Sequence, residues 1–542
     1  MSDLLPLIAR DIDKSYGDRA VLSGVDLTAS PGRPLGVVGE NGVGKSTLLR
    51  VLVGIDSADA GAVERPTDLG YVGQTLDLPA DSTVASVLRD ALTPLHDAVR
   101  HLEDLATALA EAGAEGLDAY ADALAWAQHH NAWDADRRAL RAAARLGLDR
   151  IEPDRPVAQM SGGERTRLAL AALITRQPGC VVLDEPSNHL DDSAVEFLED
   201  FLTTLPGVAV IASHDRTLLD NVCHSIVDLD PAHHGKDDAG THQYTGGFTP
   251  YLEHKRTARR RWERAFAEQQ DEFDRLRQQA RTTARQVAHN RAPRDNDKFI
   301  YHFKGANVQA TIRRRVRNAE NRIVVLEREQ IPKPPAQLHF DHRSTATNSG
   351  KAGSVISVRM LDIPGRLRLD HLDVRTGEHV LVTGTNGAGK STLLDVLARR
   401  LEPTTGRVDV RARRIGLLSQ EVDFARPDRT VLETFAAAVP DARLALTQLG
   451  LLHPRELSRP VGALSVGQQR RLALAVLVAG GPDLLLLDEP TNHISLALAS
   501  ELEQALDRST GSVVVASHDR WLRSRWRGSQ LHLDGNRLRP SA

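Results

Sequence analysis

The sequence predicts an α/β protein in which two tandem copies of one phosphate-binding domain are joined by a long antiparallel pair of helices. The first observation is a glycine-rich pattern, G-x-x-x-x-G-K-[ST], which occurs once in each half of the 542 residues. The second is a common order of further motifs behind each copy, and the third is a basic stretch of helical periodicity between the copies. The length suits two large domains with an insert, and 41% apolar residues suffice for their cores.

Both glycine-rich segments stand in the context that a phosphate-binding loop requires. Each follows an apolar run, at 34–38 or 379–383, and precedes a helical run. Glycines allow backbone N–H groups to close around phosphates, the lysine adds a cation, and the serine hydroxyl is a Mg²⁺ ligand. The residues expected to bind nucleotide are Gly39, Asn41, Gly42, Gly44, Lys45, Ser46 and Thr47, and in the second copy Gly384, Asn386, Gly387, Gly389, Lys390, Ser391 and Thr392.

An apolar run that ends in two carboxylates follows each loop. Residues 180–183 lead into Asp184 and Glu185, and residues 484–487 lead into Asp488 and Glu489. Carboxylates at the end of a buried strand are costly unless they meet a metal or a proton-transfer task. We expect the aspartates to hold Mg²⁺ through its waters and the glutamates to polarise the attacking water.

Two helix starts before the acidic runs resemble the signature of ATP-binding cassette proteins, Leu-Ser-Gly-Gly-Gln. The segments are Ser161-Gly162-Gly163-Glu164 and Ser465-Val466-Gly467-Gln468. A helix N-terminus of this kind suits an anion such as the γ-phosphate of ATP. The resemblance implies two tandem P-loop ABC ATPase domains that hydrolyse ATP.

The same family resemblance assigns a glutamine and a histidine to each half. Gln74 and Gln420 match the family's metal- and water-contacting glutamine, and His214 and His518, each within Ala-Ser-His-Asp-Arg, match its switch histidine. The resemblance implies a Mg²⁺ site in each half, with Ser46, Gln74 and Asp184 in the first and Ser391, Gln420 and Asp488 in the second.

The resemblance also implies that the two halves close head to tail with ATP between them. One site would pair Lys45 and Glu185 with Ser465 and Gly467, and the other would pair Lys390 and Glu489 with Ser161 and Gly163. Bound ATP would hold the closed state together, and hydrolysis would release it.

The halves differ at two places. Tyr16 stands where the family stacks an aromatic ring on adenine, whereas the second half reads Ile363-Pro364-Gly365 there. Asp191 in the first half is replaced by Ser495 in the second. The sequence therefore does not imply equal turnover at the two sites, although both glutamates are present.

Composition narrows the class of protein. No apolar run approaches the ~20 residues that cross a bilayer, and no charged-then-apolar signal segment follows Asp3. The only cysteines, Cys180 and Cys223, argue against disulfides and cysteine-ligated metals. A cytoplasmic protein is expected.

The stretch between the copies is basic within a chain whose net charge is −4. Residues 252–330 carry 20 Lys or Arg against 11 Asp or Glu, and residues 281–322 carry 11 against 3. A polyanion is the natural partner of such a segment. Its apolar residues recur at intervals of three, four or seven, which predicts two packed helices, stopped by Pro293 and by prolines from Pro332 onward.

The predicted tip of this helical pair interleaves cations with aromatic rings. Cations neutralise phosphates while rings stack on exposed bases, a combination suited to RNA. A solvated coiled coil is the alternative interpretation of a charged hairpin. The residues expected to contact RNA are Arg291, Arg294, Lys298, Phe299, Tyr301, Phe303, Lys304, Arg313, Arg314 and Arg315.

Tandem cassettes with a charged two-helix linker resemble the ABC-F family, whose members act on ribosomes and place the linker in the tRNA exit site. The expected domains are residues 1–240, with an enlarged, arm-like helical region at 84–150, the linker 241–335 with its tip near 291–306, and residues 336–542. The extra region fits the distance from Lys45 to Ser161, 116 positions, against 75 from Lys390 to Ser465.

Within this family the basic, aromatic tip is most similar to the proteins that protect ribosomes from macrolide- or lincosamide-type antibiotics. The resemblance implies rRNA and peptidyl-tRNA as partners, ATP and Mg²⁺ as cofactors, and a monomer that closes on itself. Three alternatives remain at this point: a general translation factor, the tandem ATPase subunit of a transporter, and a DNA-remodelling ATPase.

Overall fold

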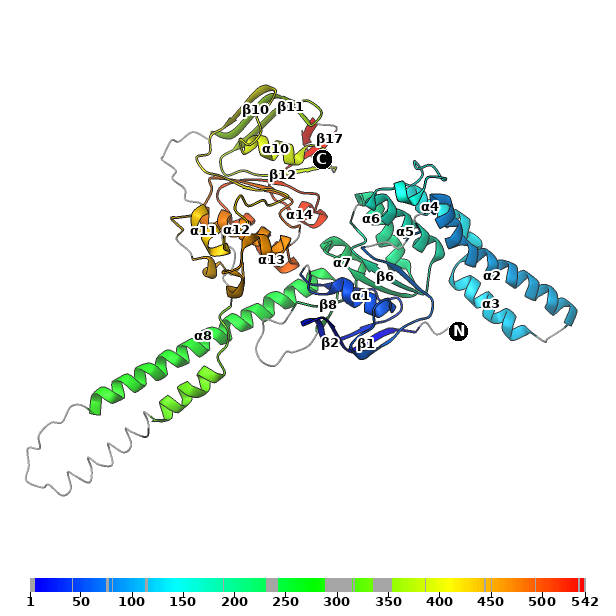
Figure 1. The fold of residues 1–542 in the computed structure, drawn as a ribbon, viewed down its shortest axis with the longest axis horizontal. Coiled ribbons are helices and arrows are strands. Elements are labelled where there is room, and N and C mark those ends of the chain that lie inside the picture. Colours follow the sequence, from blue (N-terminus) through cyan, green and yellow to red (C-terminus); the bar gives the residue numbers. More distant parts are fainter. Residues whose placement is uncertain are drawn as a thin grey trace, which may run out of the picture. The chain divides into compact units, whose positions relative to one another are not determined.

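Two six-stranded sheets with the same strand order form the centres of the two repeated domains (Figure 1). The first sheet runs β5 (Leu69–Val72), β6 (Cys180–Asp184), β7 (Val208–Ala212), β3 (Leu35–Val38), β8 (Ser225–Asp228) and β9 (His242–Thr245). The second runs β14 (Ile415–Leu418), β15 (Leu484–Asp488), β16 (Ser512–Ala516), β12 (His379–Gly384), β17 (Ser529–Asp534) and β18 (Arg537–Pro540). In each sheet only the last strand is antiparallel to its neighbour. The predicted α/β repeat is confirmed.

The computed structural model describes residues 5–40, 42–74, 78–79, 81–112, 116–188, 190–230, 242–287, 314, 317–334, 353–385, 387–442, 445–449, 451–492, 494–534 and 537–540. The chain forms two compact units. One contains both sheets, and the other contains Leu252–Pro335.

The central strands form because their residues are almost all apolar, apart from Asp184 and Asp488 at the strand ends and Ser512 at the start of β16. Every residue of β6, β7, β15 and β16 is buried, the pattern of a parallel sheet that is covered on both faces. Each domain also contains a three-stranded antiparallel sheet. It consists of β1 (Leu7–Tyr16), β2 (Arg19–Ala29) and β4 (Ala60–Glu64) in the first domain, and of β10 (Ser354–Ile363), β11 (Leu367–Arg375) and β13 (Thr405–Val410) in the second.

Helices cover these sheets and carry the motif residues at their ends. Strands β3 and β12 lead into the helices α1 (Lys45–Val53) and α10 (Lys390–Leu397), which begin at the lysines of the glycine-rich loops. The signature segments begin α5 (Gly162–Arg176) and α12 (Val466–Gly480). The remaining helices of the repeat are α6 (Asp192–Thr204) and α7 (Arg216–Val222), matched by α13 (Leu496–Arg508) and α14 (Arg520–Arg525), with α11 (Val431–Ala438) in the second domain.

The extra length of the first domain is helical. The helices α2 (Val84–Ala112), α3 (Leu117–His129) and α4 (Ala135–Arg145) share a small core of Leu95, Ala127, Ala132 and Ala135. Arg138 of α4 donates to the Thr175 carbonyl of α5, at 2.7 Å from Nη2, and thereby joins these helices to the signature helix.

The segment between the domains contains α8 (Phe248–Val287), a helix of 40 residues, and a second helical stretch at 317–328. The two run antiparallel, because Glu272 pairs with Arg322 while Gln269, earlier in α8, contacts Glu329 and Ile331. Phe273, Ala319 and Leu326 are buried, as the apolar periodicity predicts. No helix among the described residues is long and apolar enough to cross a membrane.

Gln269 joins α8 to the residues that directly follow the second helical stretch. Its Nε2 donates to the Glu329 carbonyl at 3.0 Å, and its Oε1 accepts from the Ile331 N–H at 2.8 Å. Since the side chain is only 8% exposed, water cannot replace both bonds easily.

We therefore expect Gln269→Ala to lower the free energy of local opening at Ile331 by about 1–3 kcal/mol. Hydrogen exchange of the peptides that span 317–334 measures this loss of protection. Glu268→Ala, a change at an exposed neighbour in the same helix, is the control. Equal protection in both variants would contradict the role of Gln269.

Candidate ATP hydrolysis sites

The two glutamates that we expect to activate water lie one residue beyond β6 and β15. Glu185 has φ 52° and Glu489 has φ 46°, a left-handed conformation that is costly for a residue other than glycine. The Glu185 N–H donates to the Ala212 carbonyl and the Glu489 N–H to the Ala516 carbonyl, both at 2.8 Å. Each strained residue is thus held by the neighbouring strand, with its carboxylate at the carboxyl edge of the sheet.

In the first domain the structure brings Lys45, His214 and Glu185 together. Lys45 Nζ lies 2.7 Å from His214 Nε2 and donates to the Gly39 carbonyl at 2.8 Å. Because an ammonium group only donates, the histidine contact requires an unprotonated Nε2. The His214 N–H donates to Glu185 Oε2 at 3.1 Å. These three groups therefore form one connected set.

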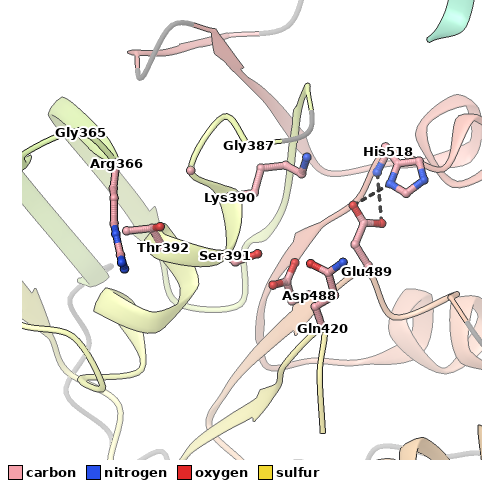
Figure 2. A pocket seen from close by; sticks show the side chains of 11 residues that line it. Gly365, Arg366, Gly387, Lys390, Ser391, Thr392, Gln420, Asp488, Glu489 and His518 are labelled. Carbon is pink, nitrogen blue, oxygen red and sulfur yellow. Dashed lines mark hydrogen bonds and ion pairs between the residues drawn. The ribbon is translucent and has the colours of Figure 1, made fainter. Parts of the chain in front are cut away.

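In the second domain the equivalent residues line a cavity of about 460 Å³ (Figure 2). Lys390 Nζ donates to the Gly384 carbonyl at 2.8 Å and to the Thr385 carbonyl at 3.2 Å. His518 Nδ1 lies 2.8 Å from Glu489 Oε1. The cavity lining includes Gly387, Gly389, Ser391, Thr392, Gln420 and Asp488. The structure thus gathers most of the predicted residues of this site around one space.

Burial shifts the pKa of the Glu185 carboxyl group in the first domain. It raises the pKa of Glu185 to about 7, against the opposing charge of Lys45. Burial also lowers the pKa of Lys45, while the charge of Glu185 opposes that shift. In the second domain the hydrogen bond with Glu489 raises the pKa of His518. The histidine and glutamate are therefore linked differently in the two sites.

The aspartates fit the predicted magnesium site. Burial raises the pKa of both Asp184 and Asp488, with the nearby Ser46 and Ser391 hydroxyls opposing the rise. Both carboxylate oxygens of Asp184 and Oδ1 of Asp488 are buried without a hydrogen-bond partner among the described residues. Buried oxygens of this kind need a cation or ordered water. We propose that Ser46, Gln74 and Asp184 hold Mg²⁺ in the first site and that Ser391, Gln420 and Asp488 hold it in the second, where it would neutralise phosphate charge.

Both signature segments begin their helices with the same reciprocal cap. The Ser161 N–H donates to Glu164 Oε2 at 2.7 Å and the Glu164 N–H donates to Ser161 Oγ at 3.3 Å. Ser465 and Gln468 exchange equivalent bonds at 2.9 and 3.3 Å. These bonds cap the first turns of α5 and α12, and a helix N-terminus is the kind of place where an anion binds. Gly163 and Gly467 lie within these turns.

One contact joins a signature helix to the loop of the other domain. Arg471 Nη2 of α12 lies 2.7 Å from Glu40 Oε2, within the first glycine-rich loop. The contact supports the proposed pairing of Lys45 with Ser465 and Gly467. The position equivalent to Glu40 in the second loop is Thr385, which carries no charge.

The place predicted for adenine contains Tyr16 in the first domain. Its ring is 47% exposed at the end of β1, and its hydroxyl donates to Asp56 Oδ2 at 2.9 Å and accepts from Arg50 Nη2 at 3.1 Å. In the second domain Arg366, in the turn between β10 and β11, lines the cavity (Figure 2). The sequence pattern for an adenine-stacking aromatic ring does not include arginine, so Arg366 was not among the predicted residues. The planar guanidinium group is an alternative stacking surface for a base.

The second sequence difference is smaller than expected. Asp191 Oδ1 accepts from the Ala194 N–H at 2.9 Å, and Ser495 Oγ accepts from the Leu498 N–H at 3.3 Å. Both side chains therefore cap the helix that follows, and the replacement removes a charge but not the cap.

Several of the predicted residues are exposed or lie outside the described residues. Gln74 is exposed just beyond β5. Asn41 and Asn386 of the glycine-rich loops lie outside the described residues, as do the tip residues Arg291, Arg294, Lys298, Phe299, Tyr301, Phe303, Lys304, Arg313 and Arg315. Arg314 is described and is exposed.

The repeated sheets and paired loops define a tandem ATP-binding cassette ATPase. The family model for ABC transporters matches residues 22–188 and 367–492. The tylosin resistance ATP-binding protein TlrC of Streptomyces fradiae is 40% identical over 540 residues, covering 96% of each chain. The energy-dependent translational throttle protein EttA of Mycobacterium tuberculosis is 30% identical and covers 95% of this chain and 89% of its own. The chain belongs to the ABC-F family.

A solved structure supports the fold. The archaeal ribosome recycling factor aABCE1, in complex with the ribosomal stalk protein aP1, matches with a TM-score of 0.56 at 17% identity, covering 97% of this chain and 89% of its own. At this identity the likeness shows two cassettes in tandem and no more.

The raised pKa of Glu185 predicts a pH dependence for the first site. Only the carboxylate form accepts a proton from water, so hydrolysis falls about tenfold per pH unit below pH 7 and is level above it. Single-turnover hydrolysis by the Glu489→Gln variant, followed from about pH 5.5 to about pH 8.5, measures this limb. A rate independent of pH across this range would contradict the assignment of Glu185 as the base.

Arg366 generates a second prediction. If it supports the base, Arg366→Ala in a Lys45→Ala background, in which the first loop has lost its phosphate-binding cation, weakens ATP binding at the second site by about fivefold, equivalent to about 1 kcal/mol. Equilibrium binding of a fluorescent ATP analogue measures the change. Arg368→Ala, two residues later in β11 and outside the cavity lining, is the matched control.

Proposed function

We propose that the protein binds the ribosome near the tRNA exit site and uses the tip of its linker to remodel the peptidyl transferase region, protecting it from antibiotics. The observation that carries this proposal is the 40% identity to a tylosin resistance protein over 96% of both chains, a span that includes the linker. The net positive charge of residues 252–330 adds to it, since rRNA is a polyanion. On this proposal the protein works in the cytoplasm.

The root of the linker is fixed to the first domain, which supports mechanical coupling to the ATP sites. The Thr249 N–H and hydroxyl donate to Asp220 of α7 at 2.6 and 2.8 Å. Tyr251 is buried, and its hydroxyl donates to Asp228 Oδ2 at 2.8 Å. Asp228 is the last residue of β8. Because α7 follows the His214 loop directly, a shift of that loop would reach the first turn of α8.

The same turn also touches the second domain. Phe248 is fully buried, and its ring lies edge-on to Trp521 of α14, with centroids 5.1 Å apart. Trp521 follows the His518 loop in the second domain. The root of α8 is therefore in contact with elements that adjoin both switch histidines.

These contacts support a cycle that begins with ATP binding. ATP and Mg²⁺ would draw each signature helix onto the loop of the other domain, and α8 would move with its root. Hydrolysis by the water that Glu185 and Glu489 activate would remove the γ-phosphate and release the protein from the ribosome. The partners on this proposal are rRNA and peptidyl-tRNA, the working form is a monomer, and residues 241–335 are the contacting segment.

A general role in translation is the second candidate, favoured by the 30% identity to a translational throttle protein. The two candidates share the ribosome, the ATP cycle and the linker. They differ in whether the protein acts because an antibiotic is bound to the ribosome.

The Glu185→Gln, Glu489→Gln double variant tests the shared part. It should bind ATP without hydrolysing it and co-sediment with ribosomes, because release requires hydrolysis. Deleting residues 291–304 should abolish co-sedimentation, and added salt should weaken it steeply. ATP-dependent recovery on membranes instead of ribosomes would contradict the proposal and favour a transporter subunit.

The wild-type protein then separates the two candidates. In a translation extract inhibited by tylosin, ribosome protection predicts recovery of synthesis that the deletion variant does not give. Ribosome binding without recovery would assign the general translation role.

A further inference from the structure

Two arginines, the buried Arg216 and the half-buried Arg520, form reciprocal ion pairs between the domains. Arg216, the first residue of α7, lies 2.5 Å from Glu503 Oε1 and 2.6 Å from Asp519 Oδ2. In the second domain Arg520, the first residue of α14, contacts Glu199 Oε1 and lies 3.3 Å from Asp215 Oδ2. Each residue of the first domain stands 304 positions before its counterpart, so one arrangement occurs twice.

Each aspartate in this cluster has two tasks. Asp519 Oδ1 caps α14, accepting from the Trp521 and Leu522 N–H groups at 2.9 and 3.2 Å, while Oδ2 binds Arg216. Asp215 Oδ1 caps α7, accepting from the Thr217 and Leu218 N–H groups at 3.0 and 3.1 Å, while Oδ2 binds Arg520. The arginine of each domain thus binds the aspartate that caps a helix of the other domain.

The two capping aspartates lie next to the histidines that contact Glu185 and Glu489. Asp519 follows His518, which contacts Glu489, and Asp215 follows His214, whose N–H donates to Glu185. The Asp519 N–H also donates to Ser517 Oγ at 3.1 Å, and the Ser517 hydroxyl donates to Glu489 Oε2 at 3.1 Å. Only one or two residues therefore separate each ion pair from the glutamate that activates water.

Charge makes the arrangement sensitive to the arginines. Two arginines serve four carboxylates, from Glu199, Asp215, Glu503 and Asp519, and all six side chains are 20% exposed or less. Removing one arginine leaves these partly shielded carboxylates without their counter-charge, which costs more than the loss of an exposed pair. The loops that carry the histidines would then lose their fixed position.

We propose that Arg216 and Arg520 are positioning residues that each hold the switch-histidine loop of the other domain, and that they couple hydrolysis at the two sites. Neither arginine lines the cavity around Lys390, so they act through Asp519 and Asp215 and not on the nucleotide. A residue of the first domain is thereby a determinant of the rate at Glu489, and a residue of the second domain a determinant of the rate at Glu185.

The test isolates one site and changes the arginine of the other domain. In a Glu185→Gln background, Arg216→Met should lower the single-turnover rate of ATP hydrolysis at the Glu489 site by about tenfold. ATP affinity at that site should change by less than about twofold, since the phosphate-binding loop is untouched. The mirror experiment places Arg520→Met in a Glu489→Gln background and follows the Glu185 site.

A double-mutant cycle distinguishes positioning from general damage. Asp519→Asn keeps the cap but removes the charge that Arg216 binds, so it should slow the Glu489 site by itself. Combined with Arg216→Met it should add less than the product of the two single effects, because both changes remove one interaction. Arg216→Lys should recover part of the rate.

The control is Arg359→Met, which breaks the exposed pair with Asp373 at 2.7 Å in the second domain. Melting curves identify variants that fail to fold, and for these the Asp519→Asn variant carries the test alone. An unchanged rate at the Glu489 site in Arg216→Met or Asp519→Asn, or fully multiplicative effects in the cycle, would overturn the proposal.

Discussion

Each ATP site depends on the close burial of opposite charges at the carboxyl edge of a parallel sheet. Lys45 and Glu185 are both largely shielded from water, and each shifts the protonation of the other. Such charges are tolerated because the glycine-rich loop, the histidine loop and the neighbouring strand provide hydrogen bonds to them. The strained backbone at Glu185 and Glu489 is part of the same arrangement, since it aims each carboxylate away from its strand and toward the phosphate site.

The two sites are built from the same parts but are not equivalent. In the first, the lysine contacts the histidine, and Arg471 of the other domain pairs with the glycine-rich loop. In the second, the lysine donates to two carbonyls of its own loop, where Lys45 donates to one, and the ring of His518 lies 2.8 Å from Glu489 Oε1. The adenine region also changes from a tyrosine to an arginine. The two sites therefore differ in the contacts that their lysine and histidine side chains make.

The linker and the ATP sites meet at the short helices α7 and α14. Each helix follows a switch histidine and is capped by an aspartate that an arginine of the other domain binds. The first turn of α8 is bonded to α7 and packs against α14. The base of the long helix is thus in direct contact with both short helices, through hydrogen bonds to α7 and through ring packing against α14.

The sequence by itself determined the repeat, the phosphate-binding loops, the acidic strand ends and the helical pair between the domains. These features are encoded within a few adjacent residues or by a regular apolar period, so local chemistry suffices to recognise them. The tertiary structure alone decided which partners the charged side chains take. Arg216 and Asp519 are 303 positions apart, and no sequence motif predicts their contact. Arg366 and Ser495 show the same limit: the sequence predicted a missing ring and a missing charge, whereas packing supplies a guanidinium group at the cavity and retains the helix cap. Long-range pairing follows from how the domains pack, which local propensity does not specify.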